Sequence, residues 1–302
     1  MSGTSGTRGR WLVVARIAFL VAVVAFGWLW LRGEGDAVLA ALREVSPASV
    51  VASLLLVLAG LVLTGFVWLR CLGRFGHHVP LRPALSVFFV GQLGKYIPGS
   101  VWSLGAQAQM ATRYAVPART TVAAGLVFLG WNVVTAGFVA SIGVLTRAIS
   151  AVPVWLGIVG LVTSVVCATP PVVNAAGSWA AGEGRRLALG VRDCATVVAL
   201  LLVTWAAYGA ALFVVSPGGG SAYRPFDAMA VFTAAYAVGV LVILAPAGLG
   251  AREAVLTVLL APFLGVGGAA AAALLTRLVH TAADFAIACA AWLLGRPARA
   301  QA

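Results

Sequence analysis

The only lysine of the chain lies in an apolar stretch that is long enough to enter a bilayer. Lys95 stands in "GQLGKYIPGS", with "LSVFFV" before it and "VWSLGAQAQM" after it. A cation within a membrane is costly and usually faces a bundle interior or an aqueous cavity. Pro98 and Gly99 break the helix and free backbone groups that could bind a phosphate or polar headgroup. We therefore predict an anion contact at Lys95; the alternative is a side chain that only extends to the interface.

Polar and aromatic residues surround this first break. Tyr96 and Trp102 flank it, and Gln107 and Gln109 follow on the returning arm. The two aromatic residues either line a lipid path or belong to an interfacial belt. The glutamines either add polar atoms to a site or pack helices together.

A second break carries another cation in an apolar setting. It reads "APAGLGAREAVL", where Pro246 ends one helix and Gly248 and Gly250 permit a tight turn. Glu253 in the first turn of the next helix suits the helix dipole, whereas a cation there is disfavoured. Adjacent helical residues do not face each other. We therefore expect Arg252 and Glu253 to have different partners, and Arg252 to contact an anionic substrate.

The last apolar segment contains three further polar residues at helical spacing. Arg277, His280 and Asp284 are three and four positions apart, which places them on one helical face. They form either a stripe that satisfies itself or a substrate clamp or proton relay. A hydrolase would need a nucleophile beside the histidine, and no motif supplies one.

Composition indicates where these residues must work. The chain has 302 residues, of which 62% are hydrophobic and 9% charged, and its mean hydropathy is +1.04. Soluble domains have roughly 25% charged residues, and several windows here exceed the roughly 18 apolar residues of a membrane-spanning helix. We predict an all-α polytopic protein of the inner or plasma membrane. A single transmembrane domain at 11–295 lies between cytoplasmic tails at 1–10 and 296–302.

The net charge of +12 has a topological explanation. The arginines lie mostly at the ends of apolar segments, where they set orientation. This disfavours nucleic acid as a partner and favours membrane phospholipids, especially anionic or phosphate-containing ones. Two protein partners stay open: a second copy of the chain, or an envelope enzyme.

Metal and cofactor chemistry has little support. The four cysteines form no C-x-x-C pair, and the chain has three histidines. A phosphate-binding loop that follows a strand is also absent from the sequence. We predict no metal site, no cofactor and no catalytic group.

Six apolar segments are predicted to span the membrane: Trp11–Leu31, Pro47–Leu69, Thr120–Leu145, Val152–Ala168, Ala195–Val215 and Gly265–Leu294. Two more, Pro83–Met110 and Phe226–Leu264, are interrupted by the two breaks. Irregular backbone is not tolerated against lipid, so both breaks should be buried in protein or line a cavity.

Basic residues orient the segments, with the N-terminus and C-terminus in the cytoplasm. Arginines flank both ends of Pro83–Met110, as expected for a re-entrant hairpin from the cytoplasmic side. Phe226–Leu264 is expected to be re-entrant from the outside, although it is long enough to span. The order helix, hairpin, helix then occurs twice in opposite orientation, an inverted repeat typical of transport sites near the midplane.

The two broken motifs together resemble the transmembrane domain of the lysylphosphatidylglycerol synthase family. The resemblance rests on "GQLGKYIPGSVWSLGAQAQMATRYAVPA" and "APAGLGAREAVL" and extends over about residues 10–295. It implies a flippase-like protein that moves a lipid or lipid-linked headgroup between leaflets. It directs attention to Lys95, Pro98 and Gly99, and to Pro246, Gly248, Gly250, Arg252 and Glu253.

The resemblance also implies what this sequence lacks. The synthases carry a soluble aminoacyltransferase domain after the membrane part, and this sequence ends at Ala302. We therefore expect no synthase activity and leave the identity of the lipid open. The alternatives are a membrane-embedded transferase acting on a lipid carrier, a non-catalytic partner subunit, and a small-solute transporter.

Overall fold

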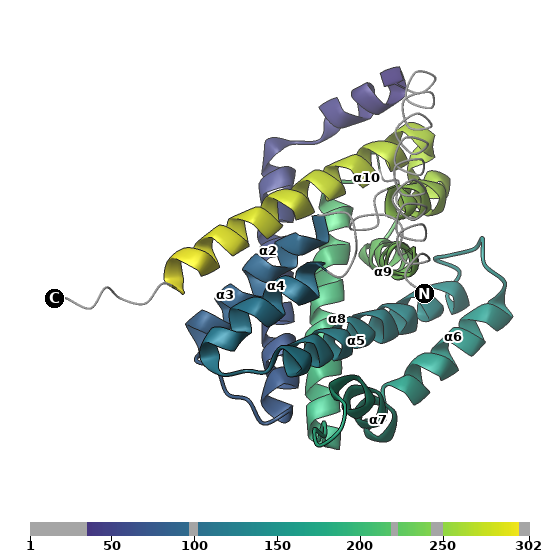
Figure 1. Cartoon of the computed structure of the whole chain (residues 1–302). Coiled ribbons are helices and arrows are strands. Elements are labelled where there is room, and N and C mark those ends of the chain that lie inside the picture. The colour runs from purple at the N-terminus through teal and green to yellow at the C-terminus, as the bar shows by residue number, and fades with distance from the viewer. Residues whose placement is uncertain (1–34, 97–101, 219–222, 243–249, 296–302) are drawn as a thin grey trace, which may run out of the picture.

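The computed structural model describes residues 35–96, 102–218, 223–242 and 250–295, and this part of the chain is helical with no strand (Figure 1). Residues 35–44 are helical and precede the labelled elements. These are α2 (Pro47–Arg74), α3 (Leu81–Gln92), η1 (Leu93–Tyr96), α4 (Trp102–Ala111), η2 (Thr112–Tyr114), α5 (Ala118–Leu145), α6 (Val154–Cys167), α7 (Pro170–Ala181), α8 (Val191–Val214), α9 (Pro225–Leu241) and α10 (Ala251–Leu294).

The same local arrangement begins three of these helices. A carboxylate at the third helical position accepts a hydrogen bond from the backbone N–H of the residue before the helix. The pairs are Asp193 with Gly190 at 3.0 Å, Asp227 with Arg224 at 2.8 Å and Glu253 with Gly250 at 2.7 Å. Each carboxylate satisfies an otherwise unpaired donor and lies at the positive end of the helix dipole.

Four helices in the described residues are long and apolar enough to cross a membrane: α2, α5, α8 and α10. They confirm the predicted spans at 47–69, 120–145, 195–215 and 265–294. The ends differ by a few residues; α2, for example, continues to Arg74. The predicted span Trp11–Leu31 and the two tails lie outside the described residues.

The predicted span Val152–Ala168 corresponds to a bent pair of helices, α6 and α7, and not to one straight helix. Helix α6 has 14 residues, which at 1.5 Å per residue is about 21 Å, less than a hydrocarbon core of about 30 Å. The chain then bends by 69° into α7. Pro170 and Pro171 begin α7 and cannot continue the hydrogen bonding of α6. Helix α7 then continues to Ala181.

Both interrupted stretches fold as helical hairpins. In the first, called hairpin A (81–111), α3 packs against α4, and a Cβ at Gly91 would collide with the side chain of Gln107. The second, called hairpin B (225–264), consists of α9 and the first arm of α10. Tyr223 before α9 lies 5.3 Å from Phe263 between ring centroids, so the two ends of hairpin B meet. The breaks themselves, 97–101 and 243–249, lie outside the described residues.

A kink separates hairpin B from the rest of α10. Gly265 has φ 68° and ψ 168°, a conformation that glycine tolerates and other residues avoid. Pro262 precedes it within the helix and lacks the N–H of a helical hydrogen bond. The second arm of α10 (266–294) corresponds to the predicted span at 265–294.

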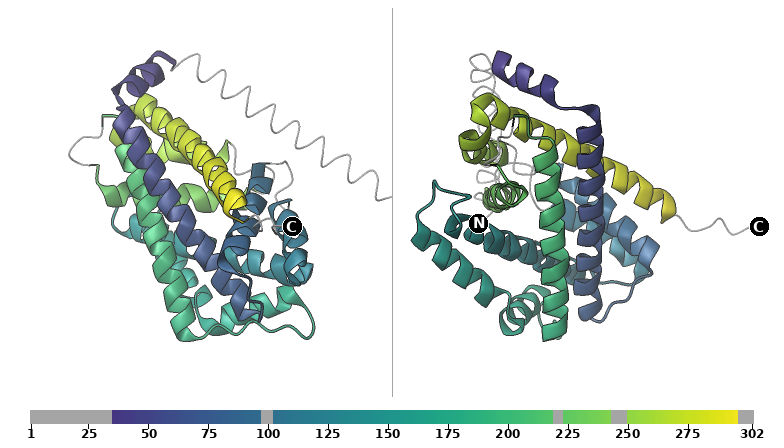
Figure 2. Two further views of the ribbon diagram at one scale, coloured as in Figure 1. Left: turned by 90° about the vertical axis from the view of Figure 1, so that its left-hand side faces the viewer. Right: turned by 180° about the vertical axis from the view of Figure 1, so that it is seen from behind.

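The order helix, hairpin, helix occurs twice with opposite direction. Arg74 near the end of α2 bonds Asp193 near the start of α8 at 2.7 Å, so these two long helices are antiparallel, as they lie side by side in Figure 2. Helix α5 packs against α9 of hairpin B, where Gly143 lies against Ala230. The second arm of α10 packs against α3 of hairpin A, and Gly295 beyond its end lies against Ser86. Each repeat thus places its last helix on the other repeat's hairpin.

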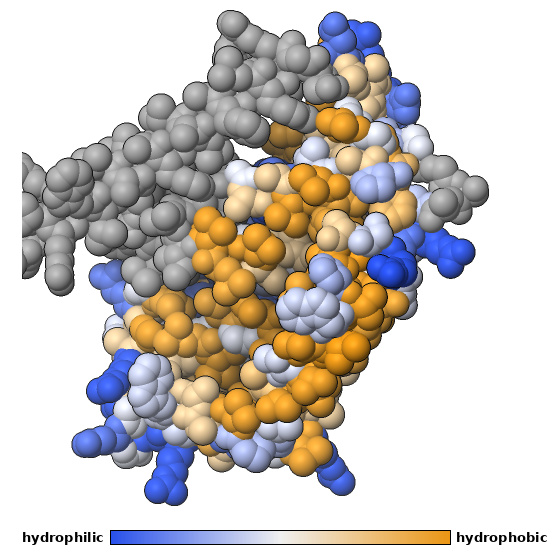
Figure 3. All heavy atoms as spheres, turned by 90° about the vertical axis from the view of Figure 1, so that its right-hand side faces the viewer, coloured by the Kyte–Doolittle hydropathy of each residue, from blue (hydrophilic) through white to orange (hydrophobic). Residues whose placement is uncertain are grey.

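The outer surface is that of a multi-pass membrane protein. In Figure 3, apolar side chains cover the middle of the face shown, and hydrophilic ones gather toward its lower and upper ends. On helix α6, for example, Trp155, Ile158 and Val162 are exposed, together with other large apolar side chains. Exposed apolar faces of this size need a hydrocarbon environment.

Candidate functional site

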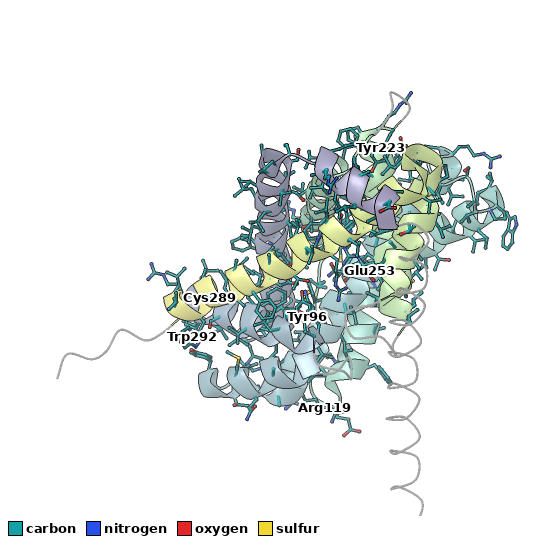
Figure 4. All side chains as sticks on the ribbon, turned by 90° about the horizontal axis from the view of Figure 1, so that it is seen from above. Tyr96, Arg119, Tyr223, Glu253, Cys289 and Trp292 are labelled. Carbon is teal, nitrogen blue, oxygen red and sulfur yellow. The ribbon has the colours of Figure 1, made fainter. Side chains whose placement is uncertain are left out.

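The second arm of α10 presents its three polar residues to different parts of the chain. Figure 4, from above, shows Tyr96 of hairpin A and Glu253 of hairpin B near the second arm of α10, with Cys289 and Trp292 further toward the C-terminal end of that arm. Asp284 binds hairpin A, Arg277 binds hairpin B, and His280 lies between them in sequence. The predicted common face exists, and it faces the interior between the hairpins.

The Asp284 carboxylate contacts the last two residues of η1, Lys95 and Tyr96. Its Oδ2 lies 2.6 Å from Lys95 Nζ and accepts a hydrogen bond from Tyr96 OH at 2.7 Å. The Tyr96 ring stacks on Phe285 with centroids 5.6 Å apart. Asp284 is buried, whereas the Lys95 side chain is 33% exposed. Lys95 therefore has a resident counterion, and a visiting anion would compete with Asp284 for it.

Arg277 makes the corresponding contact with hairpin B. Its Nη1 donates to Glu253 Oε1 at 3.3 Å, while Glu253 Oε2 accepts the Gly250 N–H. Gly250 has φ 84°, where its lack of a side chain is needed. The Glu253 carboxylate thus both caps α10 and fastens its first arm to its second.

Arg252 and its neighbour Glu253 have different contacts, as expected. Its guanidinium lies over the Phe232 ring at 4.5 Å, and its Nη2 is buried with no hydrogen-bond partner among the described residues. No described carboxylate forms an ion pair with it. Arginine keeps its charge, and an unpaired buried donor is costly. Its Nη2 could therefore donate a hydrogen bond to an anionic acceptor.

His280 is not linked to Asp284. Its Nδ1 lies 2.9 Å from the Thr276 carbonyl oxygen, and its Nε2 is buried without a partner among the described residues. The ring stacks on Phe232 at 5.2 Å and meets Tyr208 edge-on at 5.0 Å. Because Asp284 is bound to Lys95 and Tyr96, the two residues do not form an acid–base pair.

These side chains converge on a cavity of about 270 Å³ between the hairpins. Lys95, Tyr96, Arg252, Arg277, His280 and Asp284 all line it. So do polar and aromatic residues from α3, α4, α5, α8 and α9: Gln92, Gln107, Asn132, Trp205, Tyr208, Phe232 and Tyr236. Six of the predicted site residues are thus brought together. Glu253 and Gly250 do not line the cavity, and Glu253 binds the lining residue Arg277.

Comparison with known proteins identifies the family of the chain. The sequence profile of the lysylphosphatidylglycerol synthase TM region matches residues 13–288. The chain belongs to this family. A comparison with curated proteins found no match.

The match to the synthase transmembrane family covers both hairpins and every cavity residue named above. It makes the chain a multi-pass membrane protein of a family associated with the handling of lipid headgroups. Pro98, Gly99, Pro246 and Gly248 lie outside the described residues. Trp102 begins α4, and only its backbone is described.

Sequence reasoning missed most of the aromatic wall of the cavity. Trp205, Tyr208, Phe232 and Tyr236 lie in α8 and α9, which read as ordinary apolar segments. Asn132 could have been recognised from the sequence, because an amide in the middle of an apolar span is costly without a partner.

Proposed function

We propose that this protein moves a phosphate-containing phospholipid or lipid-linked headgroup between the leaflets of the cell membrane. The observation that carries the proposal is Arg252, a charged side chain with a buried, unpartnered Nη2, in a cavity between two hairpins. A phosphodiester offers the charge and the acceptor oxygens that this guanidinium lacks.

The size of the cavity supports a headgroup as the passenger. Small-molecule pockets measure roughly 300–1,000 Å³, so about 270 Å³ fits a polar headgroup and not two acyl chains. The acyl chains would stay in the bilayer beside the exposed apolar faces. Polar groups at membrane depth also lower the cost of carrying a charge through the hydrocarbon core.

The inverted repeat supports movement rather than a fixed role. Hairpins from two oppositely directed repeats meet at the cavity, the arrangement on which alternating access is built in many transporters. A transferase acting on a lipid carrier would need a general acid or base. His280 receives no support from Asp284, so the geometry favours translocation over that alternative.

Leaflet exchange in proteoliposomes tests the proposal. We expect the wild type to accelerate exchange of fluorescent phosphatidylglycerol, and Arg252→Gln to slow it by about tenfold or more. Loss of one hydrogen bond to a charged group, about 1.5–3 kcal/mol, corresponds to that factor. Arg82→Gln removes an exposed charge from α3 and is the matched control.

The outcome depends on intact protein, so each variant is first checked for an unchanged thermal unfolding midpoint in detergent. Absence of acceleration by folded wild type, with anionic, zwitterionic and aminoacylated lipids alike, would overturn the proposal. Equal loss in Arg252→Gln and Arg82→Gln would reject the role of Arg252.

A further inference from the structure

We propose that the cavity selects a headgroup with one phosphodiester and a neutral, hydroxyl-bearing remainder, that is, a polyol, over a headgroup with a cationic amine. Gln107 is the residue that would bind the hydroxyl. This inference rests on the proposed function and specifies its substrate class.

The charges around the cavity leave one cation for one anion. Its charged lining residues among those described are Lys95, Arg252, Arg277 and Asp284. Asp284 pairs with Lys95, and Glu253 pairs with Arg277 from behind. These two ion pairs balance the other charges, so Arg252 carries the one uncompensated charge among the described lining residues. A single phosphodiester would neutralise it. With that phosphodiester bound, an ammonium group in the same space would have no free counterion, because both nearby carboxylates are already engaged.

Gln107 supplies an acceptor that has no donor. Its side chain lines the cavity and is 2% exposed, and its Oε1 has no hydrogen-bond partner among the described residues. Gly91 on α3 leaves the space in which the side chain packs, because a Cβ at Gly91 would collide with it. A buried amide oxygen held in this way is costly unless a ligand donates to it.

An amide oxygen accepts equally well from a hydroxyl or an ammonium group, so the surrounding charge decides between them. The aromatic wall does not reverse this choice. Aromatic faces can enclose a quaternary ammonium ion, but Phe232 already carries Arg252 at 4.5 Å and His280 at 5.2 Å. A neutral hydroxyl needs no counterion at Gln107.

Equilibrium binding of labelled lipids to the purified full chain in neutral detergent micelles tests the inference without requiring transport. We use phosphatidylglycerol, phosphatidylmethanol and lysylphosphatidylglycerol with identical acyl chains. The first two carry the same charge, but phosphatidylmethanol has no hydroxyl; the third adds two ammonium groups. We expect phosphatidylglycerol to bind at least fivefold more tightly than either.

Gln107→Leu identifies the residue responsible. We expect it to weaken binding of phosphatidylglycerol to the level of phosphatidylmethanol and to leave phosphatidylmethanol binding unchanged. Gln109→Leu, an exposed glutamine on the same helix, is the matched control and should keep the wild-type ratio. If Gln107→Leu fails to fold, the three wild-type affinities still decide the substrate class.

The outcomes separate this inference from the proposed function. Equal or tighter binding of lysylphosphatidylglycerol, or a phosphatidylglycerol preference that survives Gln107→Leu, overturns the inference while leaving translocation intact. The expected binding pattern without leaflet exchange overturns translocation alone. Absence of saturable binding by any of the three lipids overturns both.

Discussion

Asp284→Asn is the perturbation whose size the structure sets most directly. The substitution removes the charge that faces Lys95 at 2.6 Å but keeps an acceptor for Tyr96. Breaking a fully buried ion pair costs about 3–5 kcal/mol, and an exposed pair contributes about 0–1 kcal/mol. Because Lys95 is one-third exposed and can rehydrate in part, we expect the free energy of unfolding to fall by about 2 kcal/mol.

The opposite substitution should cost more. Lys95→Met leaves the buried Asp284 with only the Tyr96 hydroxyl among its described partners, so we expect a loss of about 3 kcal/mol. Lys95→Met combined with Asp284→Asn leaves no uncompensated charge. The double variant should therefore be more stable than Lys95→Met alone, with a coupling free energy of about 2 kcal/mol.

Unfolding in mixed micelles of rising SDS fraction, followed by far-UV circular dichroism, measures these free energies. Glu183→Gln removes an exposed carboxylate outside the cavity and controls for net charge. Additive effects of the two single substitutions, or a double variant less stable than Lys95→Met, would refute the pairing and its burial. Equal losses of unfolding free energy in Asp284→Asn and Glu183→Gln would refute the size expected for the Asp284→Asn effect.

Three further outcomes are expected. Gly91→Ala should lower the thermal unfolding midpoint in detergent, because overpacking hairpin A costs about 1–3 kcal/mol. Gly105 faces open space, so Gly105→Ala should leave the midpoint unchanged. Equal midpoints for the two variants would contradict the packing at Gly91. Asp193→Asn should cost about 2–3 kcal/mol in SDS unfolding because two arginines share this carboxylate, and a change below about 0.5 kcal/mol would reject that role. Cysteines placed at Glu183 and Ala151 in a cysteine-free background should react with impermeant maleimide from opposite sides, and same-side labelling would reject the predicted orientation.

Much of the fold could be predicted because membrane insertion leaves a strong signal in the sequence. Long apolar runs identified α2, α5 and α8, and the paired glycine and proline residues identified both hairpins. The same signal did not reveal the bend that follows α6. Apolar composition reports that a segment meets lipid, but it does not report that two prolines end α6 after 14 residues.

The candidate site was predictable residue by residue, but its pairings were not. Intramembrane charges are rare, so Lys95, Arg252 and Asp284 stood out individually. The contact between Lys95 and Asp284 spans 189 positions and depends on how hairpin A packs against α10. Local spacing grouped Asp284 with His280 instead, and only the tertiary structure separates the two.

The second arm of α10 contacts the described arms of both hairpins. Arg277 and Asp284 are seven residues apart, about 10.5 Å along a helix, and they bind hairpin B and hairpin A respectively. A rigid helix that holds two hairpins through separate ion pairs couples their positions. A phosphate that entered the cavity at Arg252 would lie among cations already shared with carboxylates. Its binding would therefore compete with the contacts that hold hairpin A, and the ion pair at Lys95 is the one most open to exchange because that side chain is partly exposed.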